Sequence, residues 1–182
     1  MSLNRSLVLV TILAVLIAVG TWTISSEAAA AAAASASANG HGTLYDGVSS
    51  NGQPYRRQFS FSARLNDDGT AAGNAVLQNP AFDGANGNQP YFLQIDISCM
   101  KVIGNIAFFG GTTRRTTDPN LVDAVYFSVE DNGQPGANND QISRAFFFDD
   151  DPTTMGDPQL CQGNQVGDFP MEPIQSGNIT LR

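Results

Sequence analysis

The sequence predicts an all-β protein: an antiparallel meander of about eight strands, closed as a barrel or as a sandwich. The first observation is a period of two, in which apolar and polar residues alternate as they do in a half-buried strand. The second is a series of Asn-Gly and Asp-Gly pairs, which supply the positive φ angles of tight turns. The third is that no segment keeps an apolar period of 3.6 residues, so the crossover helices of a parallel sheet are missing. The choice between barrel and sandwich stays open.

Residues 1–38 have the pattern of a secretory signal peptide with an Ala-rich exit. An apolar run follows a single cation, residues 28–34 are all Ala, and Ala36-Ser37-Ala38 fits an A-x-A cleavage site. We therefore expect an N-terminal signal helix that is cut off at this site, which leaves one secreted β-domain over residues 39–182. A cut earlier in the Ala run is one alternative. An uncleaved anchor is the other, because residues 7–24 are just long enough to cross a bilayer.

Alternating segments with turn signals between them are the expected strands. Segment 59–65 alternates Phe, Phe, Ala and Leu with polar residues, and the Asn-Asp-Asp-Gly turn after it predicts a hairpin with segment 70–78. Segment 91–99 alternates in the same way and places Cys99 on the buried face beside its other apolar residues. The remaining expected strands are residues 106–111, 125–130, 142–148 and 174–181.

The composition excludes several classes of protein. The chain has 182 residues, 9 Lys and Arg against 17 Asp and Glu, and a net charge of -8. It lacks the cation cluster that displaces counterions from phosphate, so we expect no nucleic acid and, after signal cleavage, no membrane as partner. One His and two Cys are too few ligands for a zinc site built from these residues.

The two cysteines, Cys99 and Cys161, predict a disulfide. An exported chain meets an oxidising environment, where paired cysteines are oxidised. The bond would close a loop of 161 − 99 = 62 residues. A catalytic Cys needs a nearby His, and the single His41 lies close to the expected mature N-terminus, so nucleophilic Cys chemistry is a poor hypothesis.

Several strings of the chain resemble a group of small bacterial secreted β-domains without an established activity. In that group a C-x-x-V-x-G-N-x-A-x-x-G-G hairpin is followed by V-x-D-N-G and by a closing G-N-I strand. The corresponding strings here are residues 99–111, 129–133 and 177–179, with Phe109 where the pattern more often has a small aliphatic residue. The resemblance covers most of residues 39–182. It implies an exported, all-β and non-catalytic domain, and it carries over no catalytic residue.

An oxygen-rich loop between two expected strands is the candidate metal site. Glu130, Asp131, Asn138 and Asp140 lie at its two ends, which a hairpin brings together, and Ca²⁺ takes carboxylate and amide oxygens from such loops. The alternative is a plain loop whose Asn and Gly residues satisfy turn geometry. A second acidic run, residues 149–151, lacks the spacing of a calcium loop, and we expect it to be an acidic loop exposed to solvent.

Aromatic residues beside amide-rich loops suggest a sugar-binding surface. Rings stack on the apolar faces of sugars while amides bind the hydroxyls, although such rings also cap the core of small β-domains. The residues concerned are Tyr45, Tyr55, Phe82, Tyr91 and Phe92.

Together these patterns predict a secreted protein, extracellular or periplasmic, that is not an enzyme. No set of nucleophile, base and orienting residue is visible, so no catalytic residue and no cofactor-binding residue is predicted. We expect a structural, surface or adhesive role. The alternative is a binding module for glycan or calcium, the one cofactor that the pattern allows, and a hydrolase is the minority hypothesis. The expected partner is a cell-surface glycan, a protein or a second copy of the chain.

Overall fold

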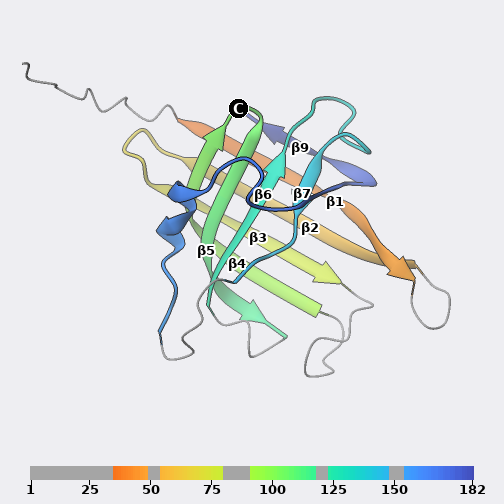
Figure 1. The fold of residues 1–182 in the computed structure, drawn as a ribbon, viewed down its shortest axis with the longest axis horizontal. Helices are drawn as coiled ribbons and strands as arrows, with labels where there is room; N and C mark the ends of the chain where they lie inside the picture. The colour runs from red at the N-terminus through yellow and green to blue at the C-terminus, as the bar shows by residue number, and fades with distance from the viewer. Residues whose placement is uncertain (1–34, 49–53, 80–90, 118–122, 148–153) are drawn as a thin grey trace, which may run out of the picture. The chain divides into compact units, whose positions relative to one another are not determined.

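The computed structural model describes residues 35–48, 54–79, 91–117, 123–147 and 154–182. They form an all-β protein in which nine antiparallel strands make one curled, half-barrel sheet, with a single short 3₁₀ helix (Figure 1). The predicted all-β class with antiparallel strands is therefore confirmed. The strands are β1 (Ala36–Val48), β2 (Pro54–Leu65), β3 (Ala71–Asn79), β4 (Tyr91–Ile103), β5 (Ile106–Thr116), β6 (Ala124–Glu130), β7 (Gln141–Ser143), β8 (Met171–Pro173) and β9 (Ser176–Leu181), and the helix is η1 (Pro158–Gly163).

The sheet is a meander with one exception at its end. Strands β1 to β8 pair in chain order, and β9 returns to pair with β1, which gives the order β8-β7-β6-β5-β4-β3-β2-β1-β9. Only residues 174–175 separate β8 from β9. The two ends of the sheet must therefore approach each other, because two residues span only about 7 Å. The sheet nevertheless does not close as the predicted barrel or sandwich, since β8 and β9 remain its two end strands.

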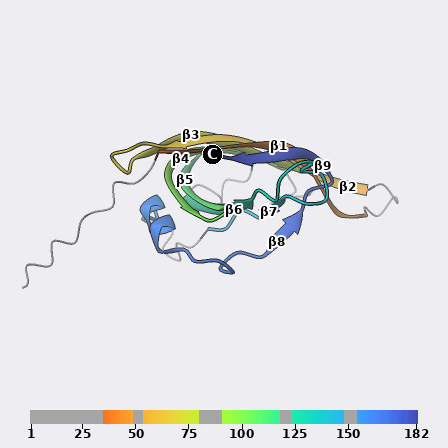
Figure 2. The same ribbon diagram turned by 90° about the horizontal axis from the view of Figure 1, so that it is seen from above.

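The curl of the sheet encloses the main hydrophobic core. Strand β2 shows the predicted alternation, with Phe59, Phe61 and Ala63 buried and the serines between them exposed. The ring of Phe61 lies 5.5 Å from that of Phe109, which stacks 4.7 Å from the ring of Phe127 (centroid distances). These three rings come from β2, β5 and β6, and they hold the flat part of the sheet against the part that curls beneath it (Figure 2).

Strand β1 was not among the predicted strands, and the predicted turn at Asn39-Gly40 lies inside it. Its inward positions include Gly40 and Gly42, so no apolar alternation appears in the sequence. The register pairs these glycines with Phe61 and Phe59, whose rings occupy the space that a Cβ on either glycine would need. Glycine is required here because the aromatic rings of the neighbouring strand cover the backbone.

A β-bulge decides the position of Cys99. The register of β4 on β5 shifts between Ile97 and Cys99, so that Ile97 and Met100 face the main core while Cys99 faces a second cluster on the opposite side of the sheet. The prediction that Cys99 is buried is confirmed, but its assignment to the face of Ile97 is wrong, because the bulge reverses the alternation.

The second cluster lies between the sheet and the segment that carries η1. It contains the predicted Cys99–Cys161 disulfide, with 6.1 Å between the two Cα atoms. Polar contacts add to the attachment: the ammonium of Lys101 on β4 donates to the carbonyls of Gln162 and Asn164 at 2.8 and 2.6 Å. Strands β5 and β6 therefore pack apolar residues on both faces, and β6 is buried from Ala124 to Val129.

Three further expectations differ from the structure or fall outside it. The strand expected over residues 142–148 is shorter, with β7 followed by an isolated bridge between Tyr126 and Phe146. Strand β8 was not predicted, because three residues that include Pro give no alternation. The expected signal peptide covers residues 1–38, of which residues 1–34 are outside the described residues. In the described part of the chain, no helix has the length and apolar character needed to cross a membrane.

The hairpin predicted around residues 66–69 is confirmed between β2 and β3. Asp68 accepts two hydrogen bonds through one carboxylate oxygen, from the hydroxyl of Thr70 at 2.6 Å and from its backbone N–H at 2.9 Å. The hydroxyl bond first, and the backbone bond second, lower the pKa of Asp68 below its ordinary value. Both bonds favour the ionised carboxylate.

We expect Thr70→Val to raise the pKa of Asp68 toward its ordinary value, because the larger of the two causes is removed. The folded pKa of Asp68 is depressed, so its contribution to stability is present above the unfolded pKa and is lost as the pH falls through the folded pKa. The variant should therefore lose less stability on acidification below about pH 4. An NMR titration of the Asp68 carboxyl measures the shift, with Ser60→Ala as control. An unchanged pKa in Thr70→Val would contradict the assignment.

Reduction of the Cys99–Cys161 bond should lower the free energy of unfolding by about 4 kcal/mol, the value for a loop of this length in the chain-entropy model. Urea unfolding with and without a reductant measures the difference. The double variant Cys99→Ala/Cys161→Ala serves as control, because it should no longer respond to the reductant. Two thiols that alkylate in the native oxidised protein would disprove the bond.

Candidate functional site

The loop between β6 and β7 is built around the carboxylate of Asp140. This side chain is fully buried. One of its oxygens accepts the backbone N–H of Asn132 at 2.9 Å, and the other accepts the backbone N–H of Ile179 on β9 at 2.7 Å. A buried carboxylate is tolerated when such donors satisfy it. Asp140 therefore joins the loop to the end strand of the sheet.

Asp131 repeats this arrangement on the same loop. One of its oxygens accepts the N–H of Gly133 within the loop at 2.9 Å, and the other accepts the N–H of Leu181 on β9 at 2.8 Å. The loop also pairs with the link between β8 and β9, where the N–H of Ile174 donates to the carbonyl of Asp140 at 3.0 Å. The N–H of Asn138 donates in turn to the carbonyl of Ile174 at 2.7 Å, so side-chain and backbone contacts together connect the loop to the β8–β9 link and to β9.

The four residues predicted as a calcium site do not all point to one position in the structure. Asp131 and Asp140 both turn toward β9, whereas Glu130 accepts a hydrogen bond from the side chain of Asn105 at 3.3 Å, and Asn138 is exposed with a φ of 67°. Among the residues that the structure describes, no group of three or more His, Cys, Asp or Glu is placed to hold a metal ion. Calcium binding stays a prediction. The second acidic run, residues 149–151, lies outside the described residues.

The outward side of five neighbouring strands carries hydroxyl, amide and imidazole groups in register. Across the strands, His41 on β1 pairs with Ser60 on β2, which pairs with Val76 on β3, while Thr43 leads in the same way to Gln58 and Gln78. We call this surface the outer face. Its polar residues are Asn39, His41, Thr43, Gln58, Ser60, Ser62, Asn74, Gln78, Gln94, Ser176, Asn178 and Thr180.

Hydrogen bonds between side chains order the outer face. The hydroxyls of Thr43 and Ser176 lie 2.7 Å apart, and the hydroxyl of Ser62 donates to the side-chain oxygen of Asn39 at 2.8 Å. Such cross-strand pairs hold their side chains in fixed rotamers, so less entropy is lost when a ligand binds them.

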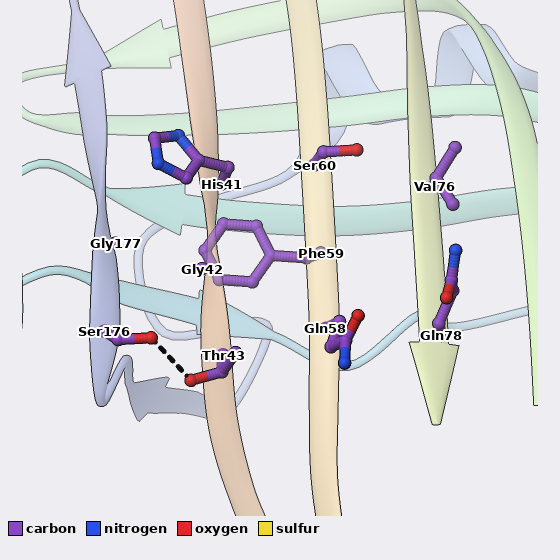
Figure 3. Close-up of a pocket in the computed structure, with 10 residues that line it drawn as sticks. All are labelled: His41, Gly42, Thr43, Gln58, Phe59, Ser60, Val76, Gln78, Ser176 and Gly177. Atoms are coloured by element: carbon purple, nitrogen blue, oxygen red, sulfur yellow. Dashed lines mark hydrogen bonds between the residues drawn. The ribbon is translucent and has the colours of Figure 1, made fainter. Parts of the chain in front are cut away.

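A shallow groove of about 450 Å³ runs over β9, β1, β2 and β3 on the outer face (Figure 3). The paired residues Gly42 and Gly177 are also part of its lining. Polar side chains from four strands line its sides. They are His41, Thr43, Gln58, Ser60, Gln78 and Ser176. The shape suits an extended chain lying on the surface better than a small molecule, which needs an enclosing pocket.

The aromatic residues predicted to bind sugar do not form a cluster in the described part of the chain. Tyr45 is 46% exposed, and the ring of Phe92 is half-buried under the guanidinium of Arg115 at 5.7 Å. The side chains of Tyr55, Phe82 and Tyr91 are outside the described residues. The sequence therefore indicated a surface of aromatic rings, whereas the structure brings hydroxyl and amide groups together on the outer face.

A second surface lies on the segment that carries η1. Among the described residues, the exposed large hydrophobic side chains other than Tyr45 are Met155, Leu160 and Val166, each about 60% exposed. Sequence analysis missed them because they follow no period. Scattered exposed apolar residues are common, so these three are a candidate protein contact of lower weight than the outer face.

Comparison with protein-family models, with curated proteins and with solved structures finds no match to this chain. The resemblance to secreted β-domains therefore stays an expectation.

We expect Asp140→Asn to lower the free energy of unfolding by roughly 2–3 kcal/mol, because the amide keeps one acceptor and places an N–H₂ group against a buried backbone donor. Urea unfolding measures the loss. The control is Asp157→Asn, since Asp157 is exposed and accepts the N–H of Gln159 at the start of η1, where Asn serves as well. Equal small effects of the two variants would show that Asp140 does not join the sheet ends.

Proposed function

We propose that this protein is an exported, non-catalytic β-domain that makes adhesive contacts at the cell surface through its outer face. The observation that carries the proposal is the ordered array of uncharged hydrogen-bonding side chains across five strands. The pattern of residues 1–38 and the Cys99–Cys161 disulfide support export, because disulfides persist in oxidising compartments.

The chemistry of the outer face favours an uncharged glycan polymer as the contact partner. Sugar hydroxyls act as both donors and acceptors, and the hydroxyls and amides of Ser, Asn and Gln complement them in both roles. Charged residues lie at the edges of the outer face: Arg56 and Arg64 on β2, and Asp96, which pairs with Asn74, on β4. A neutral polymer gains hydrogen bonds on the rest of the face without the cost of desolvating an ion.

Binding of the exported protein to neutral polysaccharides tests the proposal. We expect cosedimentation with at least one insoluble neutral glycan, such as cellulose, and an affinity at least about tenfold weaker in the variant Gln58→Glu/Ser60→Glu. Both positions are exposed, so the fold should persist, and the loss of two or more hydrogen bonds corresponds to about 1.4 kcal/mol. A thermal melt with the same glycan in soluble form gives the matching rise in melting temperature.

Leu160→Glu is the matched control, because it adds one charge at an exposed site on the segment of η1. It should bind like the wild type. Binding lost only in Leu160→Glu would move the contact to that segment and favour a protein partner. A rise in melting temperature with Ca²⁺ that a chelator reverses would instead support the calcium hypothesis. No binding to any neutral glycan would reject the proposed partner.

A further inference from the structure

Strand β1 begins before the expected start of the mature protein. Signal cleavage after Ala38 would make Asn39 the first residue, yet β1 starts at Ala36. The three residues before Asn39 are paired with β2: Ala36 with Leu65, Ser37 with Arg64 and Ala38 with Ala63. They are therefore part of the sheet.

Residues 36–38 also hold the last strand of the chain. The backbone N–H of Ser37 donates to the carbonyl of Arg182 at 2.8 Å, and the N–H of Arg182 donates to the carbonyl of Ser37 at 2.9 Å. Ala38 is fully buried and pairs with Leu181 on β9 as well as with β2. Strand β1 lies between β2 and β9 in the sheet.

A cut after Ala38 would damage this arrangement in three ways. It would remove a fully buried methyl group from the core. It would leave the N–H and carbonyl of Arg182 without their partner. It would also place a charged α-amino group on Asn39 in the middle of the sheet, between Ser62 and Thr180. The A-x-A pattern at residues 36–38 is thus part of strand β1 and does not mark the cleavage site.

We propose that the signal peptide is removed before Ala36, by a cut after one of residues 30–34, so that the mature protein begins at one of residues 31–35. This inference rests on the proposed export. Every cut in this range has Ala at the first and third positions before it, as the leader peptidases of export pathways require. A leader of 30–34 residues also comes closer to the usual length of 15–30 than one of 38.

The reaction is the hydrolysis of one peptide bond. A water molecule adds to the carbonyl carbon of an Ala in the run, the C–N bond breaks, and the leader leaves with a new carboxylate. The mature chain keeps a new amino group. Water is the only co-reactant, and the cut lies ahead of the first paired residue, so the sheet keeps all its described partners.

Expression of the full-length chain in a bacterial host with an export pathway tests the inference. The protein is recovered from the periplasm or the medium, and its N-terminus is determined by intact mass and terminal sequencing. A first residue between 31 and 35 is the expected result. A protein that is exported but begins at Ser37 or Asn39 would overturn the inference and leave the proposed export standing. A full-length chain that stays in the cell would overturn both.

Variants of Ala38 give a second readout on the same full-length chain. If Ala38 is part of the mature protein, Ala38→Ser and Ala38→Asp should lower the melting temperature of the exported protein, the milder Ser variant by roughly 4 °C or more. The control Asn39→Asp changes an exposed neighbour and should stay within about 2 °C of the wild type. Wild-type melting in both Ala38 variants would show that the residue has been removed, and would overturn the inference.

Discussion

The curl of the sheet depends on one buried carboxylate. Asp140 is fully buried, and its two oxygens are held by N–H groups from two different parts of the chain, one in its own loop and one on β9. If either donor moved away, one oxygen of the buried carboxylate would lose its hydrogen bond, which is costly in the interior. The link between β8 and β9 is only residues 174–175, so it can connect the two ends of the sheet only when they lie close together. This contact therefore helps to hold the curvature that separates the inner face from the outer face.

The same contacts protect the ends of the sheet. An exposed end strand offers unpaired backbone groups to another chain, and natural sheets block such edges with charges, proline or short strands. Here the outward N–H groups of Ile179 and Leu181 on β9 are occupied by Asp140 and Asp131. At the other end β8 has three residues and includes Pro173. Strand addition between copies is therefore disfavoured, and a contact has to use a face.

Sequence analysis found the elements whose chemistry is local. Alternation located β2 because its inward positions from Phe59 to Leu65 are apolar, but it missed β1, where Gly40 and Gly42 make room for rings on β2. It placed Cys99 on the wrong face because a bulge depends on pairing with β5, which the sequence does not display. The oxygen-rich loop was visible, but carboxylates that hold backbone N–H groups and carboxylates that hold calcium have the same pattern. The outer face could not be predicted from the sequence, because its side chains come from separate strands and only the pairing register aligns them.

The charged residues are unevenly distributed along the chain, and few of them lie on the outer face. Residues 118–182 contain 11 of the 17 acidic residues and two of the nine basic ones, so the excess negative charge belongs to the second part of the chain. The outer face is built mainly from β1 to β4, and most of its polar residues are Ser, Thr, Asn and Gln, with the charged Asp96 beside Asn74 at its edge. Net charge of one sign keeps copies of a protein apart, whereas a neutral surface can approach an uncharged polymer without that repulsion. This separation of charge from the outer face supports the proposed contact with an uncharged glycan.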